Sequence, residues 1–338
     1  PIEYSSSPSK LQLNHISLSF TKDRLEVSQL VGKQMDLLEV EIHQLTFKQI
    51  GAQTAWHGDL DIRAEVILID GLVLKDYRDK NKDRPPDVEK PMFNGMVSSI
   101  PVPLKIDSII IKNSDIYYSE LGENKLEAGT VHFANLNGSI VNVTNIPELQ
   151  QQHQSFSAIL ETELNQAAAM DLKLEVPYHG ESFYLDATIG KFDLGILNTT
   201  VTPMAGIEIS SGIVEAIEIK MNANGTEASN KLRMDYKDLN LAILKDEDHD
   251  NHKKGFFSFV ANSAIRSHNT PEQNQYHLPE YQSYRNIYRG PFNFMWESVK
   301  EGMLLIVPTE ATGILLGDIE KKSRKKQKKE RNKHKPDS

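Results

Sequence analysis

The feature that most constrains the fold is an alternation of apolar and polar residues with a period of two. In the segment MDLKLEV, Leu172 and Leu174 alternate with charged residues, and in IEIKMNA the apolar positions are Ile217, Ile219 and Met221. The pattern recurs in LEVEI, FYLDATI and KLRMDY. A β-strand points successive side chains to opposite faces, so this period predicts strands with one apolar face.

Dipeptides that contain glycine separate many of these segments and predict turns between strands. They are Asp70-Gly71, Asn137-Gly138, His179-Gly180, Ile189-Gly190 and Asn224-Gly225. Such pairs favour the tight turns of β-hairpins. We therefore predict an antiparallel meander of many strands joined by hairpins.

One phrase occurs twice and predicts a repeated structural unit. AEVILIDGLVLKDY (64–77) and IDSIIIKNSDIYYSE (106–120) both contain two apolar runs joined by a short polar break. On this interpretation Ile109 and Ile111 are strand positions, and Asn113-Ser114 is a turn or a bulge. The repetition indicates an elongated architecture of similar units rather than a site of chemistry.

The sequence contains few helical signals, so few helices are available to cover the predicted sheet. The persuasive helix is GPFNFMWESVKEGMLLIV, which has proline in its first turn and is followed by another proline. Its apolar positions at helical spacing are Phe292, Trp296, Val299, Met303 and Ile306. With little helix to cover it, the sheet must curl into a sandwich, barrel or groove, or be covered by an apolar ligand. At roughly 25 cal/mol per Å², a wet apolar face would cost more than the usual stability of a domain.

The predicted fold class is therefore mainly β. We expect an elongated antiparallel meander curled into a groove or open barrel, with one amphipathic helix near the C-terminus. The predicted organisation is a repetitive β-sheet body at 1–290, a capping helix at 291–308 and a basic disordered tail at 319–338. A break in the body, if there is one, is expected in the loop 78–98, which holds the segment RDKNKDRPPDVEKP.

The charge of the chain is divided between an acidic body and a basic tail. Residues 321–338 carry ten Lys/Arg and two Asp/Glu, which leaves 28 Lys/Arg against 45 Asp/Glu in residues 1–320. An acidic body disfavours nucleic acid as a partner, whereas the tail could contact phosphates of a membrane surface or remain solvated. The longest candidate for a membrane helix, MLLIVP, is far below the roughly 18 apolar residues needed.

Sequence motifs of catalysis are absent, so we expect no enzyme and no cofactor. There is no cysteine, no His-Glu-x-x-His and no phosphate-binding or nucleophile-elbow motif. Asp246, Asp248 and Asp250 have the spacing of a calcium loop, but Asn251 and Phe257 replace its glycine and glutamate. A solvated strand connector is the preferred interpretation there, and no metal site is expected.

An aromatic and arginine-rich stretch, YHLPEYQSYRNIYRGPFNFMW, precedes and enters the predicted helix. Aromatic residues interleaved with arginine can contact membrane interfaces, sugars or proteins. The alternative is a loop packed over the end of the sheet, with the helix buried in the core. The candidates for membrane or partner contact are Tyr284, Arg285, Tyr288, Arg289, Phe294 and Trp296.

Several longer segments resemble the AsmA-like family of bacterial cell-envelope proteins. PLKIDSIIIKNSDIYYSE and AGTVHFANLNGSIVNV are similar to that family's repeat of a strand, an Asn/Asp-Gly-like turn and a strand ending in an aromatic residue. LKLEVPYHGESFYLDATIGKFDLGILN and YRNIYRGPFNFMWESVKEGM look like the C-terminal region of its Bacteroidetes-type members. The resemblance extends over most of residues 35–308.

The resemblance implies a β-sheet curled into a groove, as in the repeating β-groove proteins that carry lipids between membranes. It also implies a periplasmic body, anchored in the inner membrane by an N-terminal segment that this chain lacks, with Gly71, Gly138, Gly212 and Gly225 as turn residues. No catalytic residue is carried over.

The expected function is to shield acyl chains in phospholipid transport between inner and outer membrane, or in outer-membrane maintenance. Expected partners are phospholipid, a membrane surface that the C-terminal region contacts, and an envelope protein. The alternative is a non-enzymatic structural or adhesive envelope protein with a closed β core that binds a protein or glycan. The apolar groove candidates are Ile109, Ile111, Leu172, Leu174, Ile217, Ile219 and Met221.

Overall fold

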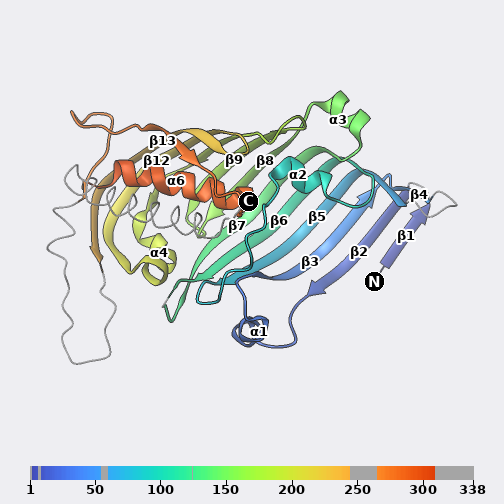
Figure 1. Cartoon of the computed structure of the whole chain (residues 1–338), viewed down its shortest axis with the longest axis horizontal. Helices are drawn as coiled ribbons and strands as arrows, with labels where there is room; N and C mark the ends of the chain where they lie inside the picture. The colour runs from blue at the N-terminus through green and yellow to red at the C-terminus, as the bar shows by residue number, and fades with distance from the viewer. Residues whose placement is uncertain (1, 7–8, 55–59, 124, 244–264, 309–338) are drawn as a thin grey trace, which may run out of the picture.

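A computed structural model describes residues 2–6, 9–54, 60–123, 125–243 and 265–308. Every strand in these ranges belongs to one sheet, drawn as arrows in Figure 1. Its order is β1 (Ile2–Ser6), β2 (Ser9–Leu18), β3 (Asp36–Lys48), β5 (Leu60–Asp79), β6 (Leu104–Leu121), β7 (Ala128–Thr144), β8 (Ser155–Leu164), β9 (Ala168–Pro177), β10 (Phe183–Ile189), β12 (Ile207–Ala223), β13 (Glu227–Ile243) and β14 (Glu280–Tyr284). Two short strands lie off this path: β4 (Gly51–Thr54) pairs with β5, and β11 (Phe192–Asp193) with β12.

The sheet confirms the predicted mainly-β fold. Neighbouring strands are antiparallel, and the end strands β1 and β14 pair with one neighbour each, so the sheet is curved but open. The exception to the meander is the parallel pair β5 and β6. A crossover at 80–103 joins these two strands, and it contains the loop in which a break had been expected. The parallel pairing makes the sheet continuous on both sides of that loop.

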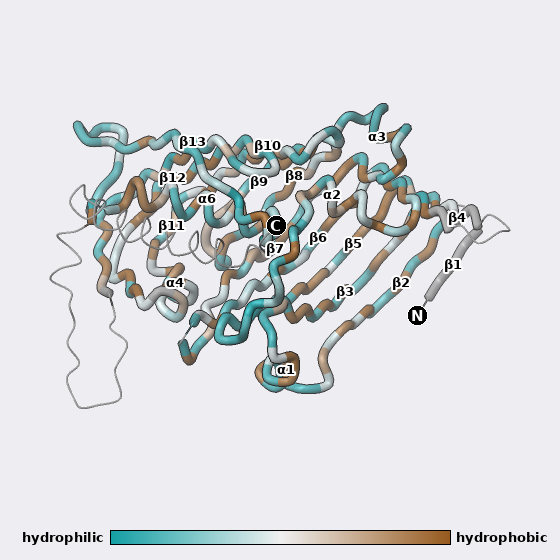
Figure 2. The backbone as a smooth tube through the Cα atoms, viewed as in Figure 1, coloured by the Kyte–Doolittle hydropathy of each residue, from teal (hydrophilic) through white to brown (hydrophobic). Residues whose placement is uncertain are grey.

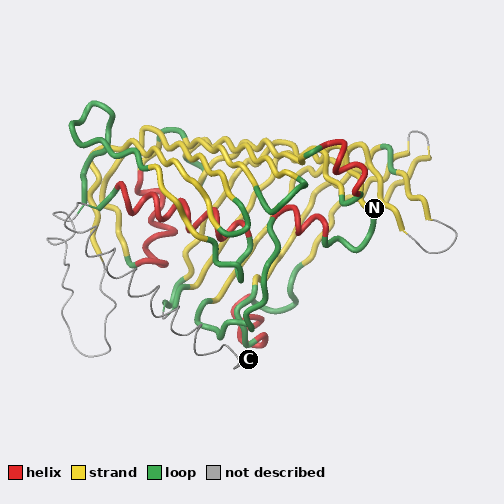
Figure 3. Tube along the Cα trace, turned by 45° about the horizontal axis from the view of Figure 1, so that its top comes forward, coloured by secondary structure: helices red, strands yellow, loops and turns green. Residues whose placement is uncertain are grey.

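The helices are short except for the one that the sequence predicts. They are α1 (Arg24–Val31), α2 (Phe93–Ser98), α3 (Pro147–His153), the 3₁₀ turn η1 (Leu194–Leu197), α4 (Asn198–Ala205) and α6 (Pro291–Ile306). Figures 1 and 3 show the sheet bent around α2, α4 and α6, which lie on its inner side. The sequence prediction missed the helices of four to eight residues because they lie in connections and have little periodicity of their own.

Three glycines that the sequence analysis assigned to turns lie inside strands instead, so that assignment is wrong. Gly71 in β5, Gly138 in β7 and Gly212 in β12 have φ of 67°, 149° and 146° within continuous strands. Glycine adopts such angles in a bulge as readily as in a hairpin turn, and the dipeptide alone does not distinguish the two. Gly225 does lie in a turn, between β12 and β13.

The residues His15, His43, Gly71 and Asn113 form a kink row across β2, β3, β5 and β6. His15, Gly71 and Asn113 have positive φ, and the strand registers place all four side by side. A Cβ on Gly71 would lie 2.8 Å from the Cβ of His43. The Asn113-Ser114 break is therefore a bulge within one long strand, and not a turn.

The kink row explains why both halves of each repeat are apolar. In β5, Ile67 and Ile69 before Gly71 and Leu72 and Leu74 after it are apolar, and Val66, Leu68 and Val73 alternate with them on the other face. A left-handed residue redirects the side chains that follow it, so odd positions before the kink and even positions after it share a face. The long strands thereby present apolar side chains to the inner side of the sheet both before and after the kink.

The buried core lies under α6, and the helix uses a different face from the predicted one. Its buried positions include Phe294, Ser298, Gly302 and Ile306. The small residues Ser298 and Gly302 allow close approach, because a Cβ on Gly302 would collide with the Tyr281 hydroxyl. Of the predicted stripe only Ile306 is fully buried, whereas Phe292 is 67% and Trp296 49% exposed. The helix is apolar on two faces, which is why spacing alone selected the wrong one.

Candidate functional site

The inner side of β2, β3, β5, β6 and β7 is an apolar surface, here called the open face. Strand registers align its side chains in two groups on either side of the kink row. Before the kinks they are Leu11, Leu13, Leu45, Phe47, Ile67, Ile69, Ile109, Ile111 and Ile140. After the kinks they are Ile16, Ile42, Val40, Leu72, Leu74, Ile116, Val131 and Phe133. All are half-buried except Ile111, which is at the buried limit.

Helices cover this surface unevenly. Within the described residues, α2 packs on β7 and β9, α4 on β6, β7 and β12, and α6 on β13 and β14, whereas no helix makes extensive contact with β2, β3 or β5. Figure 2 shows hydrophobic residues recurring along β2, β3, β5 and β6, away from the main helices. A large apolar patch that no helix of the described residues covers is unusual and marks a surface that binds something.

The inner side of β8 to β14 is a closed core, here called the covered face. Phe183, Leu185 and Met221 pack there with Phe294 of α6 and Phe93 of α2. Phe93 and Phe183 meet edge to face with ring centroids 5.3 Å apart.

The predicted apolar groove residues divide between the two faces. Ile217 and Met221 are 2% and 3% exposed and contact protein in the core. Ile219, Leu172 and Leu174 are half-buried at the margin of the covered face. Ile109 and Ile111 lie on the open face. Ile109 also packs against the margin of the closed core, as Leu172 and Leu174 do, so the open face and the covered face adjoin at β6 and β7.

Polar residues end the apolar rows of the open face near α4. On β5 the row Leu72, Leu74 continues as Asp76 and Arg78, and the register pairs Arg78 with Asp36 of β3. The Arg78 guanidinium donates two hydrogen bonds to the Asp36 carboxylate, from Nε to Oδ1 and from Nη2 to Oδ2, both at 2.6 Å. An apolar surface thus meets a charged rim within one strand.

The second strand of this rim is β6. Tyr118 pairs with Asp76 in the register and donates from its hydroxyl to Glu120 Oε2 at 2.8 Å. Lys80 Nζ lies 2.6 Å from Glu120 Oε1. Burial and the Glu120 carboxylate raise the pKa of Tyr118, so its hydroxyl stays a donor.

Asp76 is the acid of this rim whose surroundings disfavour its charged form. Burial, and next the neighbouring Asp36 carboxylate, raise its pKa to about 6, against the opposing effect of Arg78. Its Oδ1 is buried without a hydrogen-bond partner. The sequence analysis missed this rim because its members are ordinary charged strand residues. One signal in the sequence could have shown the rim: Asp76 and Arg78 occupy the alternate positions of β5 that follow Leu72 and Leu74, and so lie on the same face.

A segment here called the strap, residues 80–92, crosses the inner side from the end of β5 to α2 (Figure 1). At one end Gln34 donates from Nε2 to the carbonyls of Lys80 and Lys82, at 3.2 and 2.9 Å. At the other end the Lys90 amide donates to the Ile287 carbonyl at 2.9 Å. The strap is therefore tied at one end to the Gln34 segment and at the other to the segment that leads into α6.

The aromatic and arginine-rich stretch has mixed roles. Arg285 is 8% exposed and donates to the carbonyls of Gly225, Lys90 and Arg289, so it fastens the strap instead of contacting a partner. Phe294 belongs to the core. Among the candidates for outside contact, Tyr284 and Trp296 are exposed and Tyr288 and Arg289 are half-buried. The exposed Phe292 ring meets Phe93 edge to face, with centroids 5.1 Å apart.

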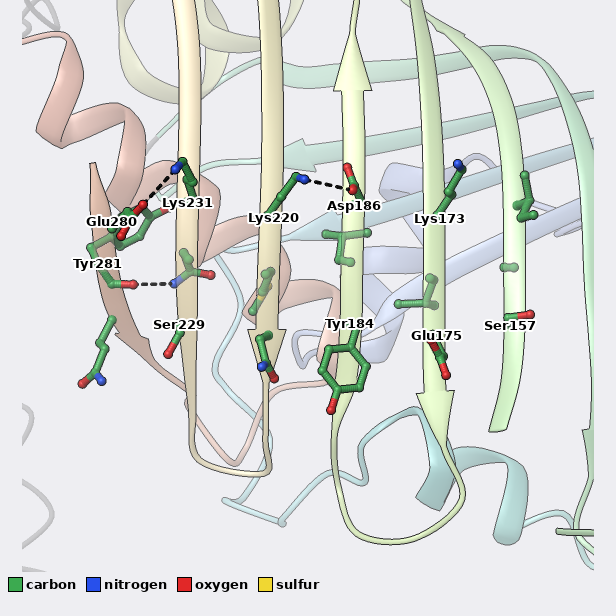
Figure 4. A pocket seen from close by; sticks show the side chains of 18 residues that line it. Ser157, Lys173, Glu175, Tyr184, Asp186, Lys220, Ser229, Lys231, Glu280 and Tyr281 are labelled. Atoms are coloured by element: carbon green, nitrogen blue, oxygen red, sulfur yellow. Dashed lines mark hydrogen bonds and ion pairs between the residues drawn. The ribbon is translucent and has the colours of Figure 1, made fainter. Parts of the chain in front are cut away.

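The outer side of β8 to β14 carries a shallow hollow of about 880 Å³ (Figure 4). Cross-strand ion pairs line it: Lys231 Nζ to Glu280 Oε1 at 2.8 Å, and Lys220 Nζ to Asp186 Oδ2 at 3.6 Å. These exposed residues alternate with the buried ones under α6, so the hollow faces away from that helix. Exposed pairs of this kind contribute little stability and indicate a solvated sheet surface.

The described ranges contain no group of three or more His, Asp or Glu side chains placed to hold a metal ion. None of their helices has the length and hydropathy to cross a membrane. The acidic loop with calcium-loop spacing and the basic tail at 319–338 lie outside the described residues.

Comparisons with known proteins add no assignment: no family model matches the chain, and a search of the curated proteins found no match. The AsmA-like resemblance therefore stays a prediction.

Proposed function

We propose that this chain is a non-enzymatic, AsmA-like envelope protein whose open face shields the acyl chains of phospholipids, in the periplasm, during lipid transport or outer-membrane maintenance. The observation that carries the proposal is the open face itself. Seventeen apolar side chains of β2, β3, β5, β6 and β7 form one continuous surface, and no helix of the described residues packs extensively on its first three strands.

The physical chemistry of the open face suits an acyl chain. Isoleucine, leucine and valine side chains offer dispersion contact and no hydrogen bonds, so they replace water around a hydrocarbon without requiring a particular shape. Burial of one methylene group contributes about 0.8 kcal/mol. The mechanism is passive shielding, with the acyl chain on the apolar rows and the headgroup toward the polar rim.

Lipid retention tests this proposal. The full chain, purified without detergent, is expected to carry phospholipid detectable by mass spectrometry. Ile67→Gln together with Leu72→Gln should reduce that lipid severalfold while the thermal unfolding curve stays cooperative. The matched control is Ile159→Gln, since Ile159 is 53% exposed on the other side of the sheet. Lipid-free protein, or equal loss in the control, would contradict the proposal.

The covered face supports the alternative, a closed β core that presents a partner surface. The exposed aromatic residues Tyr284, Phe292 and Trp296 would supply that surface. A lipid-free protein whose binding to an envelope protein or glycan depends on Trp296 would favour this alternative.

A further inference from the structure

One residue on each of six neighbouring strands belongs to an aligned row on the outer side of β8 to β14. The strand registers connect these residues from β8 through β9, β10, β12 and β13 to β14, and all six line the hollow of Figure 4. Their neighbours along each strand are more buried and lie on the inner side, so the six side chains point outward. This outer row consists of Ser157, Glu175, Tyr184, Asn222, Ser229 and Gln282.

The side chains of the outer row have polar groups that their surroundings leave free. Among the described residues, the row takes part in one side-chain hydrogen bond, from the Ser155 hydroxyl to Glu175 Oε1 at 3.3 Å. Charged residues two positions along the strands instead pair with one another, as Lys231 does with Glu280. The hydroxyl and amide groups of the other five residues of the row therefore keep both donors and acceptors available to a ligand.

The charges in the lining of the hollow balance. A ligand of high charge, such as a nucleic-acid backbone or a polybasic peptide, gains no net attraction from a balanced lining. Uncharged groups that both donate and accept hydrogen bonds suit it, and the hydroxyls of a sugar are of this kind. The lining contains three lysines and three acids: Lys173, Lys220, Lys231, Glu175, Asp186 and Glu280.

Two exposed tyrosine rings supply the apolar contact that a sugar also needs. Tyr184 lies in the outer row and is 46% exposed. Tyr284 lies two residues beyond Gln282 on the same side of β14 and is 64% exposed. A pyranose ring has a face of C–H groups that packs flat on an aromatic ring, while its hydroxyls reach the polar side chains around it. Beside Tyr184, the exposed apolar side chain of the hollow is Ile159, which is little for a protein interface.

The spacing of the strands suits a chain of sugars. Neighbouring strands lie about 4.8 Å apart, which is close to the length of one pyranose unit in a linear glycan. A glycan that lies across β9 to β14 therefore meets a new side chain of the outer row with each sugar. Within the described residues the sheet ends at β14, so a longer glycan can extend past that edge.

We propose that the outer row and Tyr284 form a binding site for a neutral, linear glycan on the outer side of the sheet. The rings of Tyr184 and Tyr284 stack on two sugars of the glycan. The side chains between these rings exchange hydrogen bonds with sugar hydroxyls, and they are Asn222, Ser229 and Gln282. The site uses no residue of the open face, so it goes beyond the proposed lipid function and does not depend on it.

Titration calorimetry on the full chain tests the site with three neutral probes: cellohexaose, maltohexaose and mannohexaose. Saturable binding of at least one probe is expected. Tyr184→Ala and Tyr284→Ala should each weaken that binding about tenfold, the effect of losing one stacked ring. Both rings are exposed, so both variants should keep the unfolding midpoint of the parent. Trp296→Ala is the matched control, because Trp296 is 49% exposed on α6 and lies outside the outer row.

The outcomes separate the glycan site from other uses of the surface. If no probe binds, or if Trp296→Ala weakens binding as much as Tyr184→Ala, the site is wrong. If Tyr184→Ala leaves glycan binding unchanged but abolishes self-association in analytical ultracentrifugation, the hollow is a protein interface and the glycan site is again wrong. Phospholipid retention should be the same in Tyr184→Ala as in the parent, so the glycan site and the proposed function can fail separately.

Discussion

The open face and the covered face lie on the same inner side of the sheet and carry the same alternation of apolar and polar residues, but different elements cover them. On β8 to β14, Phe183 and Met221 lie under α6 and α2 and form a closed core. On β2, β3 and β5, residues such as Phe47 and Leu72 remain half-exposed. A strand pattern therefore indicates which face is apolar and leaves open what covers that face. Here the chain supplies its own cover for one half of the sheet.

Truncation of a phenylalanine on each face should give the largest difference in unfolding free energy between the two faces. Phe294→Ala removes a ring that is 2% exposed and should lower the free energy of unfolding by about 3 to 5 kcal/mol. Phe47→Ala on the open face should cost about 1 kcal/mol, because its ring is partly in water already. Urea unfolding of lipid-free protein measures both. Equal losses of unfolding free energy in the two variants would mean that protein packs on the open face as closely as on the covered face.

The kink row should be the next most sensitive feature. Gly71→Ala forces a side chain to a φ of 67° and places its Cβ 2.8 Å from the Cβ of His43, so we expect a loss of about 2 to 3 kcal/mol. Gly180→Ala is the control, since Gly180 has a φ of 82° with open space around it. It should cost only the backbone strain, about 1 kcal/mol. If Gly71→Ala loses no more stability than Gly180→Ala, close packing in the kink row does not contribute to stability.

The rim of the open face should make stability depend on pH. The pKa of Asp76 is about 6 in the folded protein, above its ordinary value of 3.8, so the folded protein binds more protons than the unfolded chain between those values. Stability should therefore fall as pH rises from about 4 to about 6. Asp76→Asn should remove that loss and stabilise the protein by about 1 kcal/mol at pH 8, after allowance for solvent screening.

Thermal unfolding at several pH values measures this effect. The gain of Asp76→Asn should vanish below pH 4, where both forms of the protein are uncharged at this position. A gain that is independent of pH would show that Asp76 is not the titrating group.

The smallest effect is expected at the exposed end of α6. Trp296→Ala should change the free energy of unfolding by no more than about 0.5 kcal/mol, because Trp296 is 49% exposed and lies off the helix face that packs on the sheet. Urea unfolding of this variant, beside Phe294→Ala in the same helix, compares the two faces of α6. A loss as large as that of Phe294→Ala would place Trp296 in the core after all.

Local features of the fold could be predicted from the sequence, and the long-range ones could not. The strands and α6 follow from period-two alternation and from proline at a helix start. The parallel pairing of β5 with β6 could not be predicted, since two identical-looking units joined by a long loop fit either direction. The kink at Gly71 was mistaken for a turn, and the Asn113-Ser114 break was left open between a turn and a bulge, because a turn and a bulge need the same left-handed residue.

The candidate site shows the same limit. Apolar positions such as Ile109 and Ile111 could be named in advance, but Ile217 and Ile109 look alike in the sequence and lie on different faces. Burial under α6 depends on packing between elements far apart in the chain. The polar rim joins Asp36, Asp76 and Tyr118 from three different strands, and no local pattern connects them.

Photo-crosslinking tests directly whether phospholipid occupies the open face. A photo-reactive amino acid would be placed at Leu74 on the open face, at Met221 in the closed core and at Ile159 on the outer side. After irradiation of protein purified without detergent, the account predicts a phospholipid adduct at position 74 and none at positions 221 or 159, read by intact-protein mass spectrometry. No adduct at position 74, or adducts of equal yield at positions 74 and 159, would contradict it.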